Sequence, residues 1–505
     1  MGEQTFGKHR AAHLRMNRIF RPYDGWDGFP ARSFARLDAT EPSSLKEVGE
    51  AVFAFDAIDA SWSEFSAGHD LDLEAPSAIS EVSKALWAKL FGPKTQRPIE
   101  TLFDKMPIYR IEITAKRSSH FWSDLESLEE GQWVEIVLTA AGSHAVDVYG
   151  SIVAEAVEAY LVSVASLSGA RENALSNLFN IDAWPSSPEI DIQAALRRAT
   201  PDQLTVYDVG QGGAAGLLDC SNTASIFFDL GAGSYGNSRT RPNPLRFCWR
   251  GSPPVVLSHW DTDHWAGELT DPAASGRDWI APRQSKLGPT HHAFAARILV
   301  QGGSLLIWGA TAGATLSVTF AGGVVLSLGR CTGPSRNGSG IACLVENSSA
   351  DASWLLTGDA GYSEIPLVPS FQIIGIIAPH HGADMVRFGS APTRPGSGYC
   401  RLFYSFGPDN KHGRTSVKHP TTAAINDHRA QSWDHGTWTT TGTIATTIAG
   451  KDVLATAENS GGPTGPRNLD SAVMGWSLAP TVPLAGLPCS MIHLTVGCTT
   501  NIRQA

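Results

Sequence analysis

Short apolar segments that end abruptly in polar residues restrict the fold of this chain more than any other feature of its sequence. They recur from about residue 203, and the polar residues that end them are Asp208, Asp229, Ser258, His259, Asp359, His380, His381 and Ser405. Runs of this kind are typical of short strands that are buried on both faces. Because α/β proteins build their sites where such strands end, we expect an α/β fold with polar side chains gathered at a sheet edge.

The first 200 residues have a different texture. The segments 79–90 and 152–167 place apolar residues at helical spacing, whereas 108–114 and 132–139 alternate as strands do. Two prolines between residues 183 and 188 indicate a linker. We therefore expect three parts: an α+β region of unknown role over residues 1–200, a second domain over 201–451, and a small extension over 452–505.

Length, charge and cysteine content narrow the class of protein. A chain of 505 residues exceeds a single core, and a net charge of -10 means that contact with nucleic acid would need a local basic patch. Seven cysteines without a C-x-x-C pair argue against a disulfide framework and against a thiolate zinc site. The sequence shows neither a secretory signal nor an apolar run of about 18–20 residues, so we expect a cytoplasmic protein with no membrane partner.

The six residues from His259 to His264 combine imidazole and carboxylate groups directly after an apolar segment; those groups belong to His259, Asp261, Asp263 and His264. This ligand chemistry suits Zn²⁺, Mn²⁺ or iron. A polar loop that caps a helix would contain the same kinds of residue without binding a metal. The more distant Asp359 and the pair His380-His381 favour a metal site, because two cations about 3.5–4 Å apart need ligands from several loops.

The polar motifs occur in an order that resembles a known family. The order is Asp208-Val-Gly-Gln-Gly212, Phe228-Asp229-Leu-Gly231, Ser258-His-Trp-Asp-Thr-Asp-His264, Thr357-Gly-Asp359, Pro379-His-His-Gly382 and His419-Pro420. Over about residues 202–451 this set resembles the metallo-β-lactamase superfamily and, within it, the hydrolase domain of ComEC-type competence proteins. The resemblance implies a four-layer αββα sandwich and hydrolysis by a metal-activated hydroxide. No membrane channel accompanies the motifs, which excludes transport of DNA by this sequence.

The resemblance also implies roles for individual residues. It assigns two divalent ions, Zn or Mn: one held by His259, Asp261 and Asp359, and the other by Asp263, His264 and His381, with Asp359 as a bridge between them. In mononuclear members the aspartate at the position of Asp263 can act as the base, and His419 is a candidate proton donor. Three residues would orient the ligand loop through hydrogen bonds: Asp208, Gln211 and Asp229.

Two departures from the family pattern are visible: Gly213 stands where an acidic residue is usual, and Ala383 stands where a serine is usual. The adjacent histidines need separate roles as well, because neighbours on an extended chain face opposite sides. We expect His381 to be the ligand and His380 to support it from behind.

A basic loop precedes the segment that delivers His259. Its arginines are Arg239, Arg241, Arg246 and Arg250, and Phe247 and Trp249 lie among them. Arginines interleaved with aromatic residues suit a phosphate backbone and stacked bases. The same residues also fit a solvated loop that buries two aromatic rings, and the sequence does not distinguish between the two interpretations.

These patterns favour a metal-dependent hydrolase, most simply a phosphodiesterase or nuclease acting on nucleic acid or a nucleotide. One alternative is a hydrolase of a carbonyl substrate such as a lactone, a thioester or a β-lactam. Another is a binding module with a relic site, in which the N-terminal region recognises a protein partner.

Overall fold

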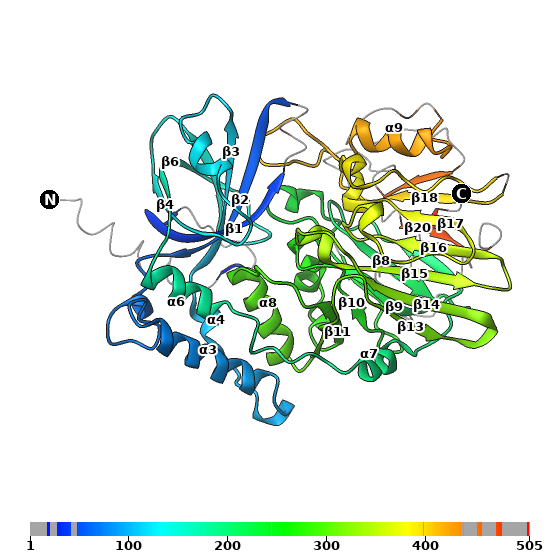
Figure 1. Cartoon of the computed structure of the whole chain (residues 1–505), viewed down its shortest axis with the longest axis horizontal. Coiled ribbons are helices and arrows are strands. Elements are labelled where there is room, and N and C mark those ends of the chain that lie inside the picture. Colours follow the sequence, from blue (N-terminus) through cyan, green and yellow to red (C-terminus); the bar gives the residue numbers. More distant parts are fainter. Residues whose placement is uncertain are drawn as a thin grey trace. The chain divides into compact units, whose positions relative to one another are not determined.

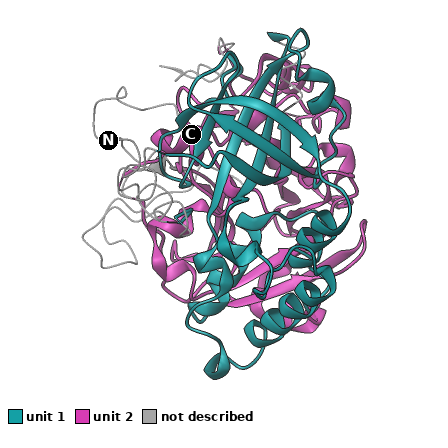
Figure 2. Cartoon of the chain, turned by 90° about the vertical axis from the view of Figure 1, so that its left-hand side faces the viewer, with its two compact units in different colours: residues 1–185, 285–302, 411–417 teal, residues 186–284, 303–410, 418–505 magenta. Residues whose placement is uncertain are grey.

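A computed structural model describes residues 18–20, 28–41, 48–243, 245–396, 398–436, 438, 452–456, 471–476 and 502–503 of the chain. The chain divides into two compact units (Figure 2). Unit 1 comprises residues 1–185, 285–302 and 411–417, and unit 2 comprises 186–284, 303–410 and 418–505. The first break falls within the proline-containing segment predicted to be a linker. The return of two later segments to unit 1 has no counterpart in the division predicted from the sequence.

Unit 1 is built on a closed six-stranded barrel with the strand order β1-β2-β3-β5-β6-β4 (Figure 1). Its strands are β1 (Arg32–Glu41), β2 (Glu50–Asp59), β3 (Ile108–Lys116), β4 (Trp133–Thr139), β5 (Ala145–Tyr149) and β6 (Val157–Ser166). Its helices are α3 (Pro76–Leu90), α4 (Leu102–Lys105), α5 (Trp122–Glu126), α6 (Ala170–Leu178) and α8 (Pro289–Val300). The predicted helix over 79–90 and the two predicted strands are confirmed.

The helix predicted over residues 152–167 is wrong, because most of that segment forms strand β6. Ala159 and Leu161 alternate into the barrel core, and Val164 joins them beyond an irregularity in the pairing with β4. The spacing of the apolar residues fits both a helix and a strand. The segment forms a strand because it pairs with β4 on one side and with β5 on the other.

Unit 2 contains two large sheets, one of eight strands in the order β12-β11-β10-β9-β8-β7-β20-β21 and one of seven in the order β13-β14-β15-β16-β17-β18-β19. The first uses β7 (Gln203–Val206), β8 (Ala214–Leu218), β9 (Ala224–Leu230), β10 (Val255–Val256), β11 (Asp278–Pro282), β12 (Ser304–Trp308), β20 (Ser471–Met474) and β21 (Ile502–Arg503). The second uses β13 (Thr315–Thr319), β14 (Val324–Arg330), β15 (Ile341–Asn347), β16 (Ala352–Leu356), β17 (Gln372–Ile377), β18 (Arg401–Tyr404) and β19 (Val453–Ala455). Two helices belong to the described part of this unit: α7 (Glu189–Leu196) and α9 (Thr422–Ala430).

The two sheets of unit 2 share one hydrophobic core, to which Phe228 and Ile280 contribute from the first sheet and Trp354 and Phe403 from the second. The short apolar runs of the sequence are its strands, so the predicted mixed α/β fold with several sheets is confirmed. Strands β9 to β12 run parallel, as do β16 to β19. Their carboxyl ends therefore lie at one edge of each sheet, as predicted.

The region predicted as a C-terminal extension takes part in both sheets where it is described. Strand β19 pairs with β18, and β20 pairs with β7. The Gly- and Pro-rich stretch 460–466 lies outside the described residues, as do Cys489 and Cys498. Cys248 is disulfide-bonded, although the cysteine pattern argued against a disulfide framework, whereas Cys331 and Cys343 are free and buried. Within the described ranges, no helix combines the length and apolar character needed to cross a membrane.

A buried ionic cluster holds the first turn of α8 against the barrel inside unit 1. The backbone N–H of Thr290 donates to Asp56 Oδ2 at 3.2 Å, and Arg110 pairs with Asp38 at 2.8 Å. His291 Nε2 lies 3.6 Å from Asp38 Oδ1, while its Nδ1 accepts the Gly288 N–H at 2.9 Å. Because Nδ1 accepts, the ring proton sits on Nε2 and faces Asp38. That tautomer suits a hydrogen bond rather than a metal ligand.

The Asp56 carboxyl generates a prediction about stability. Burial first, and then the charge of Asp38, raise its pKa to about 7. The folded state therefore binds more protons than the unfolded state between about pH 4 and pH 7, so this group's contribution to the free energy of unfolding falls as pH rises through that window. Asp56→Asn keeps an acceptor for Thr290 but does not titrate. We expect its free energy of unfolding, relative to that of wild type, to rise by about 2–4 kcal/mol between pH 4.5 and pH 8.

Urea unfolding of both proteins at several pH values measures this difference. The matched control is Asp70→Asn, which changes an exposed aspartate of the same unit. Parallel curves of unfolding free energy against pH for wild type and Asp56→Asn would contradict the assignment.

Candidate metal centre

Five strand ends of unit 2 deliver the polar residues singled out in the sequence. In the first sheet, Asp229 lies near the end of β9 and His259 follows β10. In the second sheet, Asp359 follows β16, the pair His380-His381 follows β17 within a short turn over 379–382, and Ser405 follows β18. The carboxyl edges of the two sheets therefore meet around one group of side chains.

Asp359 lies between two sets of these side chains. Its Oδ1 is 3.1 Å from His264 Nε2, and its Oδ2 is 3.6 Å from His259 Nε2. Each carboxylate oxygen thus faces a different imidazole, which is the arrangement a bridging carboxylate needs.

The first set surrounds His259. Asp261 Oδ2 lies 3.4 Å from His259 Nε2, and Asp359 Oδ2 completes the set. The second set surrounds His381, whose Nε2 lies 3.1 Å from Asp263 Oδ2, with His264 beside it. All six residues assigned as ligands from the resemblance therefore lie close together. The ligand atoms that are mutually close form two groups, His259 with His264 and Asp359, and Asp263 with His264 and His381, so His264 belongs to both and Asp261 joins through His259.

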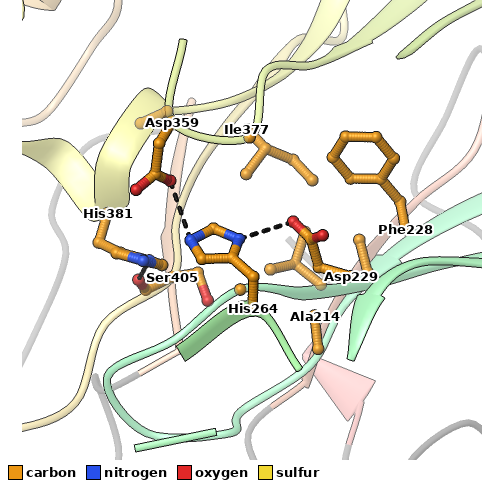
Figure 3. A pocket seen from close by; sticks show the side chains of 13 residues that line it. Ala214, Phe228, Asp229, His264, Asp359, Ile377, His381 and Ser405 are labelled. Atoms are coloured by element: carbon orange, nitrogen blue, oxygen red, sulfur yellow. Dashed lines mark hydrogen bonds and ion pairs between the residues drawn. The ribbon is translucent and has the colours of Figure 1, made fainter. Parts of the chain in front are cut away.

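A chain of hydrogen bonds through Asp229 sets the tautomers of two histidines. Asp229 Oδ2 receives His264 Nδ1–H at 2.8 Å and the Ser258 hydroxyl at 2.7 Å. Because the Ser258 hydroxyl donates its hydrogen bond to Asp229, the Ser258 oxygen is left to accept one from His259 Nδ1–H at 3.0 Å. On the other side of the site, His381 Nδ1–H donates to the Ser405 carbonyl at 2.9 Å (Figure 3).

These bonds leave the Nε2 lone pairs of three histidines directed at carboxylate oxygens. Within the described residues, the buried Nε2 atoms of His259, His264 and His381 have no hydrogen-bond partner, and neither has Asp359 Oδ1. Lone pairs facing lone pairs at 3.1–3.6 Å repel unless a cation or a proton lies between them. The donor set therefore fits divalent cations.

The charges of the site lead to the same conclusion. Burial alone would lower the pKa of His264, but the carboxylates of Asp359 and Asp229 outweigh it and raise that pKa well above its ordinary value. Among the described residues, the guanidinium that pairs with this group of carboxylates is that of Arg336, bound to Asp261. The enclosed site therefore has an excess of negative charge that bound cations would offset.

His380 does not face away from the site, as was expected from an extended chain. Both histidines adopt left-handed backbone conformations, with φ of 47° at His380 and 55° at His381. In that turn His380 Nε2 points back to within 3.6 Å of Asp359 Oδ2. The rule that neighbours face opposite sides fails here because it applies only to extended backbone.

Two glycines allow the ligand loop to lie close to β9. The Gly231 N–H donates to the Gly213 carbonyl at 2.7 Å, and the Gly213 N–H donates to the Asp263 carbonyl at 3.1 Å. A Cβ at Gly231 would lie 1.8 Å from the Asp263 oxygen, and one at Gly213 would lie 3.0 Å from His264 Nδ1. The glycine at 213, which departs from the family pattern, thus leaves room for the His264 ring.

Three other predicted residues lie around the site without reaching its centre. Asp208 accepts the Gly210 N–H, and the Gln211 side chain accepts the Gly407 N–H, so both organise loops. His419 is completely buried, is held by Asn410 through both backbone groups, and places its ring 5.4 Å from that of His380.

The basic loop is held mainly by contacts to the backbone. Arg241 donates to the Gly233 carbonyl at 2.8 Å, and its burial lowers its pKa to about 10. Arg246 donates to the Thr270 carbonyl, Arg239 donates to the Asp409 carbonyl, and Arg250 is exposed. Phe247 and Trp249 pack beside Phe227. The aromatic residues therefore have a structural role, while three of the arginines are exposed.

The sequence assigned no role to two contributors. The Ser405 carbonyl fixes His381; the sequence pattern singles out Ser405 as a polar residue at a strand end, but without a function. Arg336, which binds Asp261, comes from a loop without any motif. Beside these groups lies a small pocket whose lining includes Phe228 and Ile377 (Figure 3).

Comparisons with known proteins place the chain in no family. No family model matches it, and no curated protein matches it. Among solved structures, it is similar to Zn²⁺-bound PqqB from Methylobacterium extorquens, with 12% identity over 49% of this chain and 81% of that one, and a TM-score of 0.24. A likeness of this size identifies neither an activity nor a family.

The role of Asp229 leads to a prediction. Asparagine at 229 would retain the shape of the side chain but could not accept from His264, Ser258 and the Ser258 backbone as the carboxylate does. We expect Asp229→Asn to weaken Zn²⁺ binding by about 10–100-fold, because the ring orientations of two ligands are lost. Competition with a chromophoric chelator measures the affinity.

Asp219→Asn is the control, since Asp219 holds the turn between β8 and β9 through hydrogen bonds to Ser221 and Thr223. Equal affinities for wild type and Asp229→Asn would show that Asp229 does not orient the histidines.

Proposed function

We propose that this protein is a metal-dependent hydrolase of the metallo-β-lactamase superfamily that cleaves phosphodiesters in nucleic acid or a nucleotide. In this proposal unit 2 is the family's αββα sandwich, with the two sheets that share a core as its inner layers. The observation that carries the proposal concerns three buried histidine Nε2 atoms that have no hydrogen-bond partner within the described residues and that face carboxylate oxygens. Those of His259 and His264 face the two oxygens of Asp359, and that of His381 faces Asp263.

Two divalent ions, Zn²⁺ or Mn²⁺, would be held by the two sets of residues that Asp359 joins. One set is His259, Asp261 and Asp359, with His380 close by; the other is Asp263, His264, His381 and Asp359. Bound there, such ions supply an activated water near neutral pH and stabilise negative charge that develops on the substrate.

The protein's own groups complete the chemistry. Asp263 is about one quarter exposed, with its Oδ2 beside His381, so it is the ligand carboxylate best placed to take a proton at the mouth of the site. His419 was expected to donate a proton to the leaving group, but its ring is buried and packs edge-on against that of His380. In this proposal His380, whose ring is partly exposed, would donate the proton, and His419 would position that ring.

The preference for phosphodiesters over carbonyl substrates rests on charge. Three ligand carboxylates and exposed arginines at 239, 246 and 250 suit a substrate that brings negative charge to cations. A lactone, thioester or β-lactam carries no such charge and would not need the arginines.

Metal content and turnover together test the proposal. Elemental analysis of wild type should find about two ions per chain. His259→Ala should lose at least one of them and more than about 100-fold of the rate on single- and double-stranded DNA, RNA or cyclic nucleotides. His69→Ala, which changes an exposed histidine of unit 1, should keep both properties.

Two other results would lead elsewhere. Turnover of a chromogenic lactone, thioester or lactam without phosphodiesterase activity would replace the substrate class. Wild-type protein without metal, even after reconstitution with Zn²⁺ and Mn²⁺, would contradict hydrolysis itself and favour a binding module.

A further inference from the structure

Arg336 lies at the metal centre, and neither the sequence pattern nor the proposed reaction accounts for it. Its side chain is almost fully buried, and its Nε donates to Asp261 Oδ1. The other oxygen of the same carboxylate, Oδ2, faces His259 Nε2 at 3.4 Å. Arg336 and His259 therefore face different oxygens of the Asp261 carboxylate.

We propose that Arg336 is a positioning residue that holds Asp261 in the orientation needed to bind one of the two cations, the one beside His259. The inference rests on the proposed metal site. Without Arg336, the Asp261 side chain, which is 16% exposed, could rotate into solvent and leave that cation with fewer protein ligands. A ligand carboxylate is commonly fixed in this way by a donor behind it.

The loop that carries Arg336 is built to hold a side chain in place. The Gly333 N–H donates to the Gly338 carbonyl at 2.8 Å, and the Ser339 N–H donates to the Ser335 carbonyl at 2.9 Å. Glu364 packs so closely that a Cβ at Gly333 would lie 2.2 Å from its Oε1. Closed turns of this kind leave the backbone of Arg336 little freedom.

The same loop is attached directly to the strand end that carries the ligands. The Ile341 N–H donates to the Ser258 carbonyl at 2.7 Å. A Cβ at Gly340 would lie 2.5 Å from that carbonyl oxygen and 3.2 Å from the Cβ of His259. The distance between Arg336 and the ligand loop is thus set by backbone contacts, which is what a positioning role requires.

Arg336 also explains why the two cation positions should differ. The position beside His381 uses Asp263, whose Oδ2 lies 3.1 Å from His381 Nε2. The position beside His259 depends on a carboxylate that a guanidinium already holds. Removing the guanidinium should therefore weaken the binding of one ion and leave the binding of the other unchanged.

Zn²⁺ titration against a chromophoric chelator tests this inference on the full chain. Wild type should bind two ions, and Arg336→Met should bind one as tightly as wild type and the other about 10–100-fold more weakly. Asp261→Asn should weaken the binding of the same ion. The double variant should be little worse than Asp261→Asn alone, because the two side chains act as one unit.

Arg198→Met is the matched control, since it removes another arginine of unit 2 that pairs with an aspartate, Asp278, at the surface. It should bind both ions as wild type does. Melting temperatures show whether each variant is folded, and should Arg336→Met not fold, Arg336→Lys and Asp261→Asn decide. In that case Arg336→Lys should still weaken the binding of the same ion, because an ammonium cannot reproduce the guanidinium geometry.

Two ions bound as tightly in Arg336→Met as in wild type, or more tightly, would overturn the positioning role while leaving the proposed hydrolase intact. Full affinity for both ions in Asp261→Asn or in Arg336→Lys would overturn it equally. Wild-type protein that binds no ion would end the proposed function and this inference together.

Discussion

The hydrogen bonds of Asp229 are the interactions on which the rest of the site depends. One carboxylate receives the Ser258 backbone, the Ser258 hydroxyl and His264, and through Ser258 it also sets His259. With both Nδ1 protons directed to this network, both Nε2 lone pairs must face the centre. The position of β9, which carries Asp229, therefore determines which atoms are presented to a cation.

The fold supplies the rigidity that such a network requires. Two sheets share one core, and their parallel strands end at edges from which five loops reach the same point. Close backbone contacts at Gly213 and Gly231 bring the ligand loop against β9. Left-handed backbone at His380 and His381 turns both rings inward, at a strain of about 1–3 kcal/mol each that the surrounding structure must offset.

Much of this arrangement could be predicted from the sequence, because a strand end is a local pattern. The apolar runs before Asp229, His259, Asp359 and His381 fixed both the strands and the side of the sheet where their polar ends meet. The turn at His380 could not be predicted, since nothing local marks two successive left-handed residues. Nor could Arg336, whose role arises from a loop contact 75 residues away from Asp261 along the chain. The helix expected over 152–167 failed because barrel pairing, not spacing, decides β6.

The most direct test of the account is X-ray diffraction from crystals of the zinc-loaded protein, with anomalous data collected at the zinc absorption edge. Two anomalous peaks should lie on either side of the Asp359 carboxylate, one within bonding distance of His259 and Asp261 and the other within bonding distance of Asp263, His264 and His381. A fully loaded crystal with no peak among these side chains, or with zinc bound only at the protein surface, would contradict it.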